Sequence, residues 1–307
     1  MEEKVYYYKS YGKIIKSEIE ISEFIVNDYV NDDNVDIVVK QGSMPEKIKK
    51  QRDEENIARF YDGNEIWFYI KNVGTYYIKD AKTILVEPEE GYIFNDLKAF
   101  LIWRSMAACL LQKDIVTIHG SAVIINEKAV IFTGRSGSGK STLTAAFRKD
   151  TYKFLSDELC VLSIDEDQYP IVNPGYPQQR LAKNTLEGLG FNCNDFIISK
   201  ESNQMYSVPA NNDFVNTPIK LAAIIEIEPC DDIENVEIEE LEGTSKLMGM
   251  LKNVYMYWCT KYTGFRKSYY KQCINLAQNV RFLKLKRPKN GFTVNEQMKL
   301  VLEELVN

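Results

Sequence analysis

The stretch TIHGSAVIINEKAVIFTGRSGSGKSTLTAAF, residues 117–147, determines the expected fold class. Within it, GRSGSGKS (134–141) satisfies the phosphate-binding pattern G-x4-G-K-[ST]. The apolar run KAVIFT (128–133) leads into the loop, and the helix-forming run STLTAAF (141–147) follows it. This order of strand, loop and helix predicts an α/β nucleotide domain, because loop N–H groups and a helix N-terminus together bind phosphate oxygens.

The loop also predicts which residues hold the nucleotide. Glycines allow backbone N–H groups to close around phosphate oxygens. Lys140 is expected to reach the β- and γ-phosphates of ATP, and the Ser141 hydroxyl is expected to ligate Mg²⁺. ATP and Mg²⁺ are therefore the expected cofactors. The expected nucleotide-binding residues are Gly134, Arg135, Ser136, Gly137, Ser138, Gly139, Lys140, Ser141 and Thr142.

His119 is the only histidine of the chain and lies fifteen residues before the loop. Asn126-Glu127 reads as a two-residue hairpin turn, so residue 125 should pair with residue 128. Continued outward, this register places His119 opposite Gly134, beside the phosphates. The alternative is that a lone histidine in an apolar strand only fills the core, and the sequence leaves both interpretations open.

An acidic pair, Asp157-Glu158, follows Lys140 by seventeen and eighteen residues. That distance allows a helix, a short return and a neighbouring strand that ends near the phosphates. One acid could then hold Mg²⁺ while the other accepts a proton from an incoming hydroxyl. The alternative is an ordinary acidic pair at a strand entrance. Glu226 and Glu228 are a weaker later candidate, because alternating glutamates also suit the solvent face of an edge strand.

Residues 1–94 are predicted to form a β-rich N-terminal domain and residues 95–307 the nucleotide domain. A buried helix over 94–114 should join them, and the proline-containing middle, 166–220, reads as loop-rich. The expected N-terminal strands lie within 4–21, 35–42, 55–63, 64–72, 74–80 and 82–88. Later strands are expected over 115–125, 128–134, 153–164 and 219–229, and helices over 140–150, 244–258, 267–279 and 295–307.

Composition excludes several protein classes. The chain of 307 residues is 45% hydrophobic and 27% charged, as in globular proteins. Its net charge of −6 argues against non-specific nucleic-acid binding, and it contains no apolar run of the ~18 residues that a membrane span needs. The N-terminus lacks the apolar core of a secretory signal, and the six cysteines are scattered without a CxxC pair. These features predict a cytoplasmic protein with reduced thiols that contacts neither membrane nor nucleic acid.

Three of these motifs together resemble the HPr kinase/phosphorylase superfamily, whose nucleotide domain is similar to that of ATP-dependent phosphoenolpyruvate carboxykinase. They are His119-Gly120, the loop 134–141 and the pair Asp157-Glu158, and the resemblance covers about residues 115–165. The whole-chain layout is similar to the smaller HPr-kinase-like proteins of ribosomal peptide clusters, such as lasso-peptide kinases. PGYPQQRL (174–181) is part of that likeness.

The resemblance implies roles for individual residues. It makes Glu158 the general acid/base, assigns Asp157 and Ser141 to the metal, and places His119 near the transferred phosphoryl group. Arg180 becomes a candidate clamp for phosphate oxygens, with a surface arginine in a proline-rich loop as the alternative. The implied function is an ATP-dependent kinase acting on a serine of a peptide or small protein, with the N-terminal domain helping to present it.

The chain also departs from the regulatory enzymes of this superfamily. Its second acid is Glu158 rather than aspartate, Thr142 replaces an acidic residue after the loop, and their C-terminal signature for HPr binding and dephosphorylation is missing. The departures indicate an acceptor other than HPr. A kinase for an amino acid or another small molecule, and a non-catalytic ATP-binding regulatory module, stay open as alternatives. The sequence also leaves open whether the chain forms a homo-oligomer.

Overall fold

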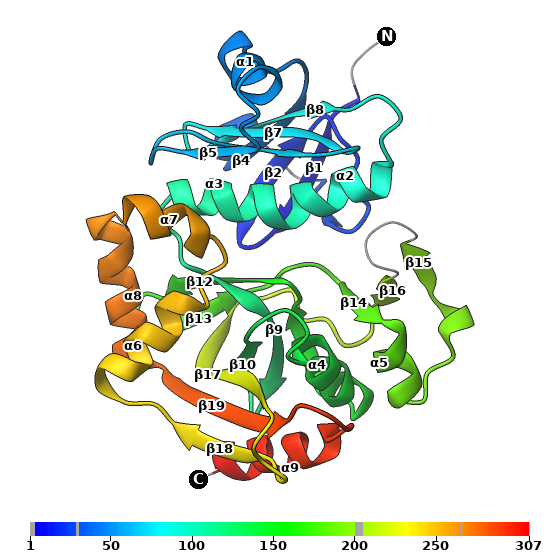
Figure 1. The fold of residues 1–307 in the computed structure, drawn as a ribbon, viewed down its shortest axis with the longest axis vertical. Coiled ribbons are helices and arrows are strands. Elements are labelled where there is room, and N and C mark those ends of the chain that lie inside the picture. Colours follow the sequence, from blue (N-terminus) through cyan, green and yellow to red (C-terminus); the bar gives the residue numbers. More distant parts are fainter. Residues whose placement is uncertain (1–3, 29–30, 200–204, 265, 307) are drawn as a thin grey trace. The chain divides into compact units, whose positions relative to one another are not determined.

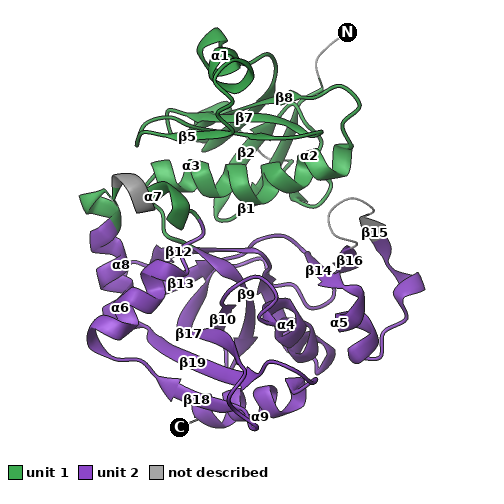
Figure 2. Ribbon diagram, in the orientation of Figure 1, with its two compact units in different colours: residues 1–117, 256–269 green, residues 118–255, 270–307 purple. Residues whose placement is uncertain are grey.

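The structure, a computed structural model, describes residues 4–28, 31–199, 205–264 and 266–306. The chain forms two compact units (Figure 2). Unit 1 comprises residues 1–117 and 256–269, and unit 2 comprises residues 118–255 and 270–307. The helical segment after residue 94, which the sequence analysis assigned to the nucleotide domain, therefore lies in unit 1.

Unit 1 is built on an eight-stranded sheet of order β3-β1-β2-β4-β8-β7-β6-β5 (Figure 1). Its strands are β1 (Tyr6–Ser10), β2 (Lys13–Ser17), β3 (Ile25–Val26), β4 (Ile37–Gln41), β5 (Arg59–Tyr61), β6 (Ile66–Ile70), β7 (Gly74–Lys79) and β8 (Thr83–Pro88). Most neighbours are antiparallel, whereas β4 runs parallel to β2 and β8. The predicted β-rich character of this region is confirmed.

The helices of unit 1 are partly as predicted. The buried helix is observed as α2 (Phe94–Phe100), a π-helical segment (Leu101–Ser105) and α3 (Met106–Gln112). The Tyr76 hydroxyl on β7 donates to the Leu97 carbonyl of α2, at 2.9 Å, and so links the helix to the sheet. The sequence did not predict α1 (Glu46–Asp53), whose only buried residue, Ile48, joins a small core cluster with Trp67. A short 3-10 helix (Asp32–Asn34) and α7 (Tyr257–Thr263) complete the unit.

Unit 2 is centred on a sheet of order β10-β9-β12-β13-β17-β19-β18, with β11 paired to β9. The strand β10 also pairs with β17, so the path of pairings β10-β9-β12-β13-β17 returns to its start. The parallel set β10, β17 and β19 carries the carboxyl edge from which the glycine-rich loop 134–139 leaves. The strands are β9 (Thr117–Ile125), β10 (Lys128–Thr133), β11 (Lys153–Ser156), β12 (Leu159–Ile164), β13 (Pro170–Asn173), β17 (Ile219–Cys230), β18 (Glu237–Glu240) and β19 (Arg281–Pro288).

Helices cover both faces of this sheet. On one face α4 and α9 share a core with β10 and β19, in which the rings of Phe132 and Phe147 stack 5.5 Å apart. Alternate strand residues point to opposite faces, and Phe282 accordingly lies against Gly249 of α6 on the other face. The helices of this unit are α4 (Lys140–Lys149), α5 (Lys183–Gly188), α6 (Gly243–Lys252), α8 (Lys267–Asn279, which begins in unit 1) and α9 (Val294–Val306). The structure is thus of the mixed α/β class.

Three sequence-based expectations for unit 2 were wrong. The segment 166–220 is not mainly loop, because it contains α5, a 3-10 helix (Cys193–Asp195) and a three-stranded sheet of β14 (Gln178–Ala182), β16 (Met205–Pro209) and β15 (Ile197–Ser199). The single strand expected over 153–164 is broken into β11 and β12, because Glu158 adopts a positive φ of 64°. The helix expected over 244–258 ends at Lys252, and α7 begins four residues after Asn253.

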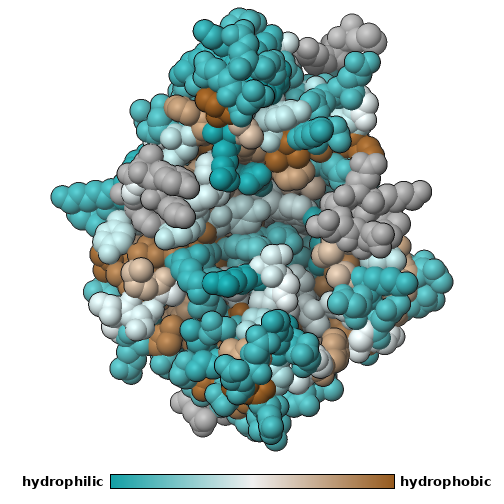
Figure 3. Space-filling view, viewed as in Figure 1, coloured by the Kyte–Doolittle hydropathy of each residue, from teal (hydrophilic) through white to brown (hydrophobic). Residues whose placement is uncertain are grey.

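The face of the molecule drawn in Figure 3 mixes hydrophilic and apolar residues. Exposed large apolar side chains, including Val26, Tyr169, Ile197 and Met248, come from different elements. Within the described parts of the chain, no helix is both long and apolar enough to cross a membrane. All six cysteines are free thiols.

Candidate active site

The glycine-rich loop 134–139 connects β10 to α4, so the predicted order of strand, loop and helix is observed. Gly134 has a φ of +134°, and a Cβ atom there would lie 2.6 Å from the Ile227 carbonyl oxygen of β17. Gly139, immediately before α4, has a φ of +109°. Glycine is required at both positions, since residues with a Cβ atom rarely adopt such φ values.

Lys140 and Ser138 are held close to the loop backbone. The Lys140 ammonium donates to the carbonyls of Gly134 and Arg135, at 3.0 and 3.2 Å, and only 8% of the residue is exposed. Burial lowers the pKa of Lys140, against the opposing charges of the Glu158 and Asp157 carboxylates. The buried Ser138 hydroxyl has no hydrogen-bond partner among the described residues. A phosphate oxygen is an acceptor that fits both groups.

A second cation flanks the loop. Arg287, on β19, donates from Nε to the Ser138 carbonyl at 2.9 Å and from Nη1 to the Pro288 carbonyl at 2.8 Å. Burial lowers the pKa of Arg287. Arg287 was not predicted as a site residue, because β19 was not predicted from the sequence. The available signal was a basic run, KLKRPK, that could end at the same carboxyl edge as the loop.

The predicted hairpin register is confirmed. Strands β9 and β10 pair from Ile125↔Lys128 to Gly120↔Thr133. Both turn residues, 126 and 127, have positive φ values of 50° and 61°, as a tight hairpin turn requires. His119 therefore lies one position beyond the last paired residue, at the end of the hairpin that leads into the glycine-rich loop 134–139.

His119 contacts an acid. Its Nε2 atom lies 3.4 Å from Oε2 of Glu158, and the ring makes an edge contact with Tyr255, with 5.5 Å between ring centroids. Its backbone N–H donates to the Asn253 carbonyl, and its carbonyl accepts from the Thr133 hydroxyl. The side chain is 35% exposed. This environment differs from that of a histidine filling an apolar core. Tyr255 and Asn253 were missed, since they lie in the segment predicted as one continuous helix.

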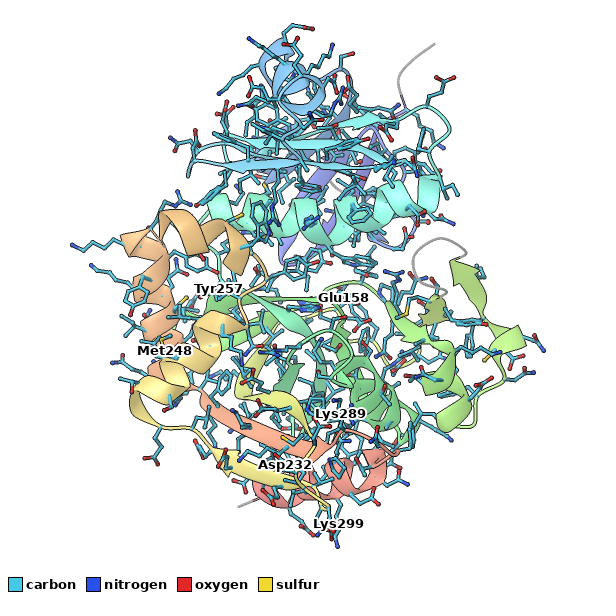
Figure 4. The ribbon with its side chains drawn as sticks, viewed as in Figure 1. Glu158, Asp232, Met248, Tyr257, Lys289 and Lys299 are labelled. Carbon is cyan, nitrogen blue, oxygen red and sulfur yellow. The ribbon has the colours of Figure 1, made fainter. Side chains whose placement is uncertain are left out.

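The acidic pair lies at the break between β11 and β12, and its two side chains have different surroundings. Asp157 is 1% exposed, with Oδ1 accepting from the Ser121 hydroxyl and Oδ2 accepting from the Arg180 backbone N–H at 3.0 Å. Glu158, labelled in Figure 4, lies where β12 begins, and its side chain is 24% exposed. The pair therefore divides into a buried acid that ties β9 to β14 and a more accessible acid that faces His119.

These surroundings shift the pKa values of Asp157 and Glu158 in opposite directions. Burial, followed by the neighbouring charge of Glu158, raises the pKa of Asp157 to about 6. Burial also opposes ionisation of Glu158, but the His119 hydrogen bond and the charges of Arg180 and Lys140 prevail, so the pKa of Glu158 falls below its ordinary value. Glu158 is consequently ionised at neutral pH and able to accept a hydrogen bond from a hydroxyl group.

Arg180 is brought to the site by β14. Its charge acts on Glu158, and its neighbour Gln179 donates from Nε2 to the Ser141 carbonyl at 3.0 Å. The strand that carries the PGYPQQRL segment is thus linked to both the acidic pair and the start of α4. On the loop side, the Thr142 hydroxyl lies 2.8 Å from the Thr185 hydroxyl of α5. Arg135, Ser136 and Gly137 are exposed.

Ser141 and the acidic pair are the residues that would hold Mg²⁺, together with phosphate oxygens and waters. The described residues contain no group of three or more histidine, cysteine or acidic side chains placed to hold a metal. Mg²⁺ is commonly held by one or two carboxylates together with waters and phosphate oxygens, and Ser141 with the acidic pair supplies oxygens of this kind. The weaker candidates are engaged elsewhere, since Glu226 pairs with Lys252 and Glu228 pairs with Lys284, each at 3.0 Å.

The raised pKa of Asp157 predicts a pH-dependent stability. An acid whose pKa is higher in the folded than in the unfolded state destabilises the fold when it ionises. The wild type should therefore lose roughly 3 kcal/mol of unfolding free energy at this site as the pH rises from about 4 to about 6. The side chain introduced in Asp157→Asn cannot ionise, so the free energy of unfolding of this variant should rise relative to that of the wild type between about pH 4 and about pH 6. Urea unfolding at several pH values measures this difference. Glu158→Gln removes a charge that raises the pKa of Asp157, so the pH range over which stability is lost should become narrower. A difference in unfolding free energy between Asp157→Asn and the wild type that does not change with pH would contradict the raised pKa of Asp157.

No protein-family model matches the chain, and no curated protein sequence matches it significantly. Among solved structures, it is similar to the Hpr(Ser) kinase/phosphatase from Coxiella burnetii. That match has a TM-score of 0.29 and 14% sequence identity, and it covers 62% of this chain and 93% of that chain.

Proposed function

We propose that the chain is a Mg²⁺-ATP-dependent kinase that phosphorylates a serine-type hydroxyl on a peptide. The observation that carries the proposal is the position of the ionised Glu158. This carboxylate faces His119 and is acted on by the charges of Lys140 and Arg180. A phosphate-binding loop, an adjacent base and flanking cations are the groups that phosphoryl transfer to a hydroxyl requires.

Each residue has a role in this proposal. Lys140 exchanges its bonds to the Gly134 and Arg135 carbonyls for phosphate oxygens, and Arg180 contributes further positive charge. Glu158 accepts the proton of the acceptor hydroxyl. The oxygen of that hydroxyl forms a bond to the γ-phosphorus, while the bond from the γ-phosphorus to the β–γ bridging oxygen breaks and ADP leaves. Bound Mg²⁺ would supply charge neutralisation on the phosphates, with Ser141 and Asp157 as its protein ligands.

The acceptor is proposed to be a peptide. A peptide acceptor distinguishes this function from two alternatives. A small-molecule kinase would use the same groups on an amino acid or another hydroxyl compound. A regulatory module would need the loop but not Glu158. The pairing of this acid with His119 beside the loop favours catalysis, because a sensor of nucleotide phosphates has no use for a base.

The direct test is incubation of the full chain with Mg²⁺-ATP and serine-containing peptides, followed by mass spectrometry. Addition of phosphate to a serine, and its loss when that serine is replaced by alanine, is the expected result. Peptides encoded beside the gene are the first acceptors to test, with free serine as the small-molecule comparison. Transfer to free serine alone would favour the small-molecule kinase, and nucleotide binding without transfer to any acceptor would favour the regulatory module.

His119→Ala is expected to lower the rate of transfer about a hundredfold. The change removes the partner that lowers the pKa of Glu158 and orients its carboxylate. His119→Gln, which keeps an N–H donor, should retain more activity. Steady-state rates with a melting curve for each variant provide the measurement. Full activity in a folded His119→Ala protein would show that the histidine is not needed for the chemistry.

A further inference from the structure

A pocket of about 290 Å³ opens beside the phosphate-binding loop. Its walls include Gly139 and Thr142 from the loop and the first turn of α4, Asn184 at the start of α5, and Phe292 and Gln297 from the C-terminal segment. Lys289, which follows β19 and also lines the pocket, is labelled in Figure 4. All of these residues belong to unit 2. The pocket is not lined by the proposed general base Glu158 or by its partner His119.

The pocket suits the nucleoside part of a nucleotide. Because Gly139 and Thr142 form one wall, the rest of a ligand with its phosphates on the loop would extend into this space. The planar guanidinium of Arg287 and the ring of Phe292, which packs against Gly188 of α5, offer flat surfaces for a base. Its size is near the lower end of the range for small-molecule sites, roughly 300–1,000 Å³.

One side chain of the wall has an unused hydrogen-bonding group. Gln297, in the first turn of α9, is 5% exposed, and its Nε2 donates to the Thr293 hydroxyl at 3.1 Å. Its buried Oε1 has no partner among the residues that the structure describes. Buried acceptors are nearly always satisfied in native proteins, so an orphaned one in a pocket wall indicates a donor on the ligand. Gln297 lines the pocket, and rotation about its soft terminal torsion would turn Oε1 toward a ligand there.

We infer that Gln297 recognises adenine by accepting a hydrogen bond from its exocyclic amine. This inference rests on the proposed nucleotide-dependent function and adds the identity of the base. Guanine carries a carbonyl oxygen at the corresponding ring position, which places two acceptors against each other. A purine held in this orientation would bind more tightly as adenine than as guanine, through a residue that lies outside the phosphate-binding motif.

The test compares ligands that differ only in the base. Binding of ATP, GTP, the ATP analogue without the exocyclic amine (purine riboside triphosphate) and inorganic tripolyphosphate is measured by calorimetry for the wild type and Gln297→Met. The wild type should bind ATP about tenfold more tightly than purine riboside triphosphate. Gln297→Met, of similar length, should bind these two alike and bind tripolyphosphate as the wild type does. Its melting temperature should stay close to the wild-type value, because it also removes an unsatisfied buried acceptor.

The outcomes separate this inference from the proposed function. Equal binding of ATP and purine riboside triphosphate by the wild type overturns base recognition by an amine acceptor, and that comparison needs no variant. A preference for ATP that persists in Gln297→Met assigns the recognition to another residue and also overturns the inference. Failure of the wild type to bind ATP, GTP and tripolyphosphate would overturn the proposed kinase function as well.

Discussion

Replacing Glu158 by glutamine is expected to slow phosphoryl transfer about a thousandfold while nucleotide binding persists. Glutamine keeps the size of the side chain but cannot accept the proton of the acceptor hydroxyl. The carboxylate is held ionised by His119, Arg180 and Lys140, so the lost group is a charged base and not a buried neutral acid. The phosphate-binding loop is a separate element and should still bind the triphosphate.

The measurement is the rate of peptide phosphorylation alongside the dissociation constant of ATP. Glu228→Gln is the matched control, since Glu228 is a glutamate of β17 whose side chain is 41% exposed and pairs with Lys284. That variant should keep wild-type rates. Unchanged activity in Glu158→Gln would remove the residue from the chemistry. If biological activity also survived in that variant but not in Lys140→Ala, the ATP-binding regulatory module would replace the kinase as the better account.

Gly120→Ala is expected to lower the free energy of unfolding by about 3 kcal/mol. A Cβ atom at Gly120 would lie 2.5 Å from the Phe132 carbonyl oxygen and 3.1 Å from the Ile131 side chain. The first of these neighbours is backbone of the paired strand and cannot move aside without opening the β9–β10 ladder. Because His119 precedes Gly120, the strand shift would also displace the site histidine.

Gly137→Ala provides the comparison for this steric effect. No atom lies within 4 Å of a Cβ atom built at Gly137, but its φ of +79° disfavours alanine, at a cost of about 1 kcal/mol. Denaturant unfolding of both variants should therefore give a clearly larger loss for Gly120→Ala. Equal losses would show that the strands separate easily at this point and that the close approach does not limit the fold.

The parts of the site that the sequence predicted correctly depend on short-range rules. The turn at 126–127 determines the β9–β10 register, and the glycine pattern locates the loop between β10 and α4. Neither inference needs a residue that is distant in the chain. The same applies to the approach of His119 to the loop, because that follows from the register alone.

The parts that the sequence did not predict depend on distant partners. The strand β19 is rich in basic residues and reads as polar, yet Lys284 and Lys286 pair with Glu228 and Glu239 on its two neighbouring strands. These cross-strand ion pairs become visible only when β17 and β18 lie beside it. Arg287 and Gln297 were missed for the same reason, since their proximity to the loop comes from tertiary packing and no local motif marks them.

The left-handed backbone at Glu158 has an evolutionary consequence. A φ of 64° is a poor conformation for glutamate and a comfortable one for glycine. Selection for stability alone would therefore favour glycine at this position, whereas selection for a base would retain the acid despite the strain. Under the proposed function, natural variants of this chain that carry glycine here should keep the fold and the loop while losing phosphoryl transfer. This one position would then distinguish variants that transfer phosphate from variants that only bind nucleotide.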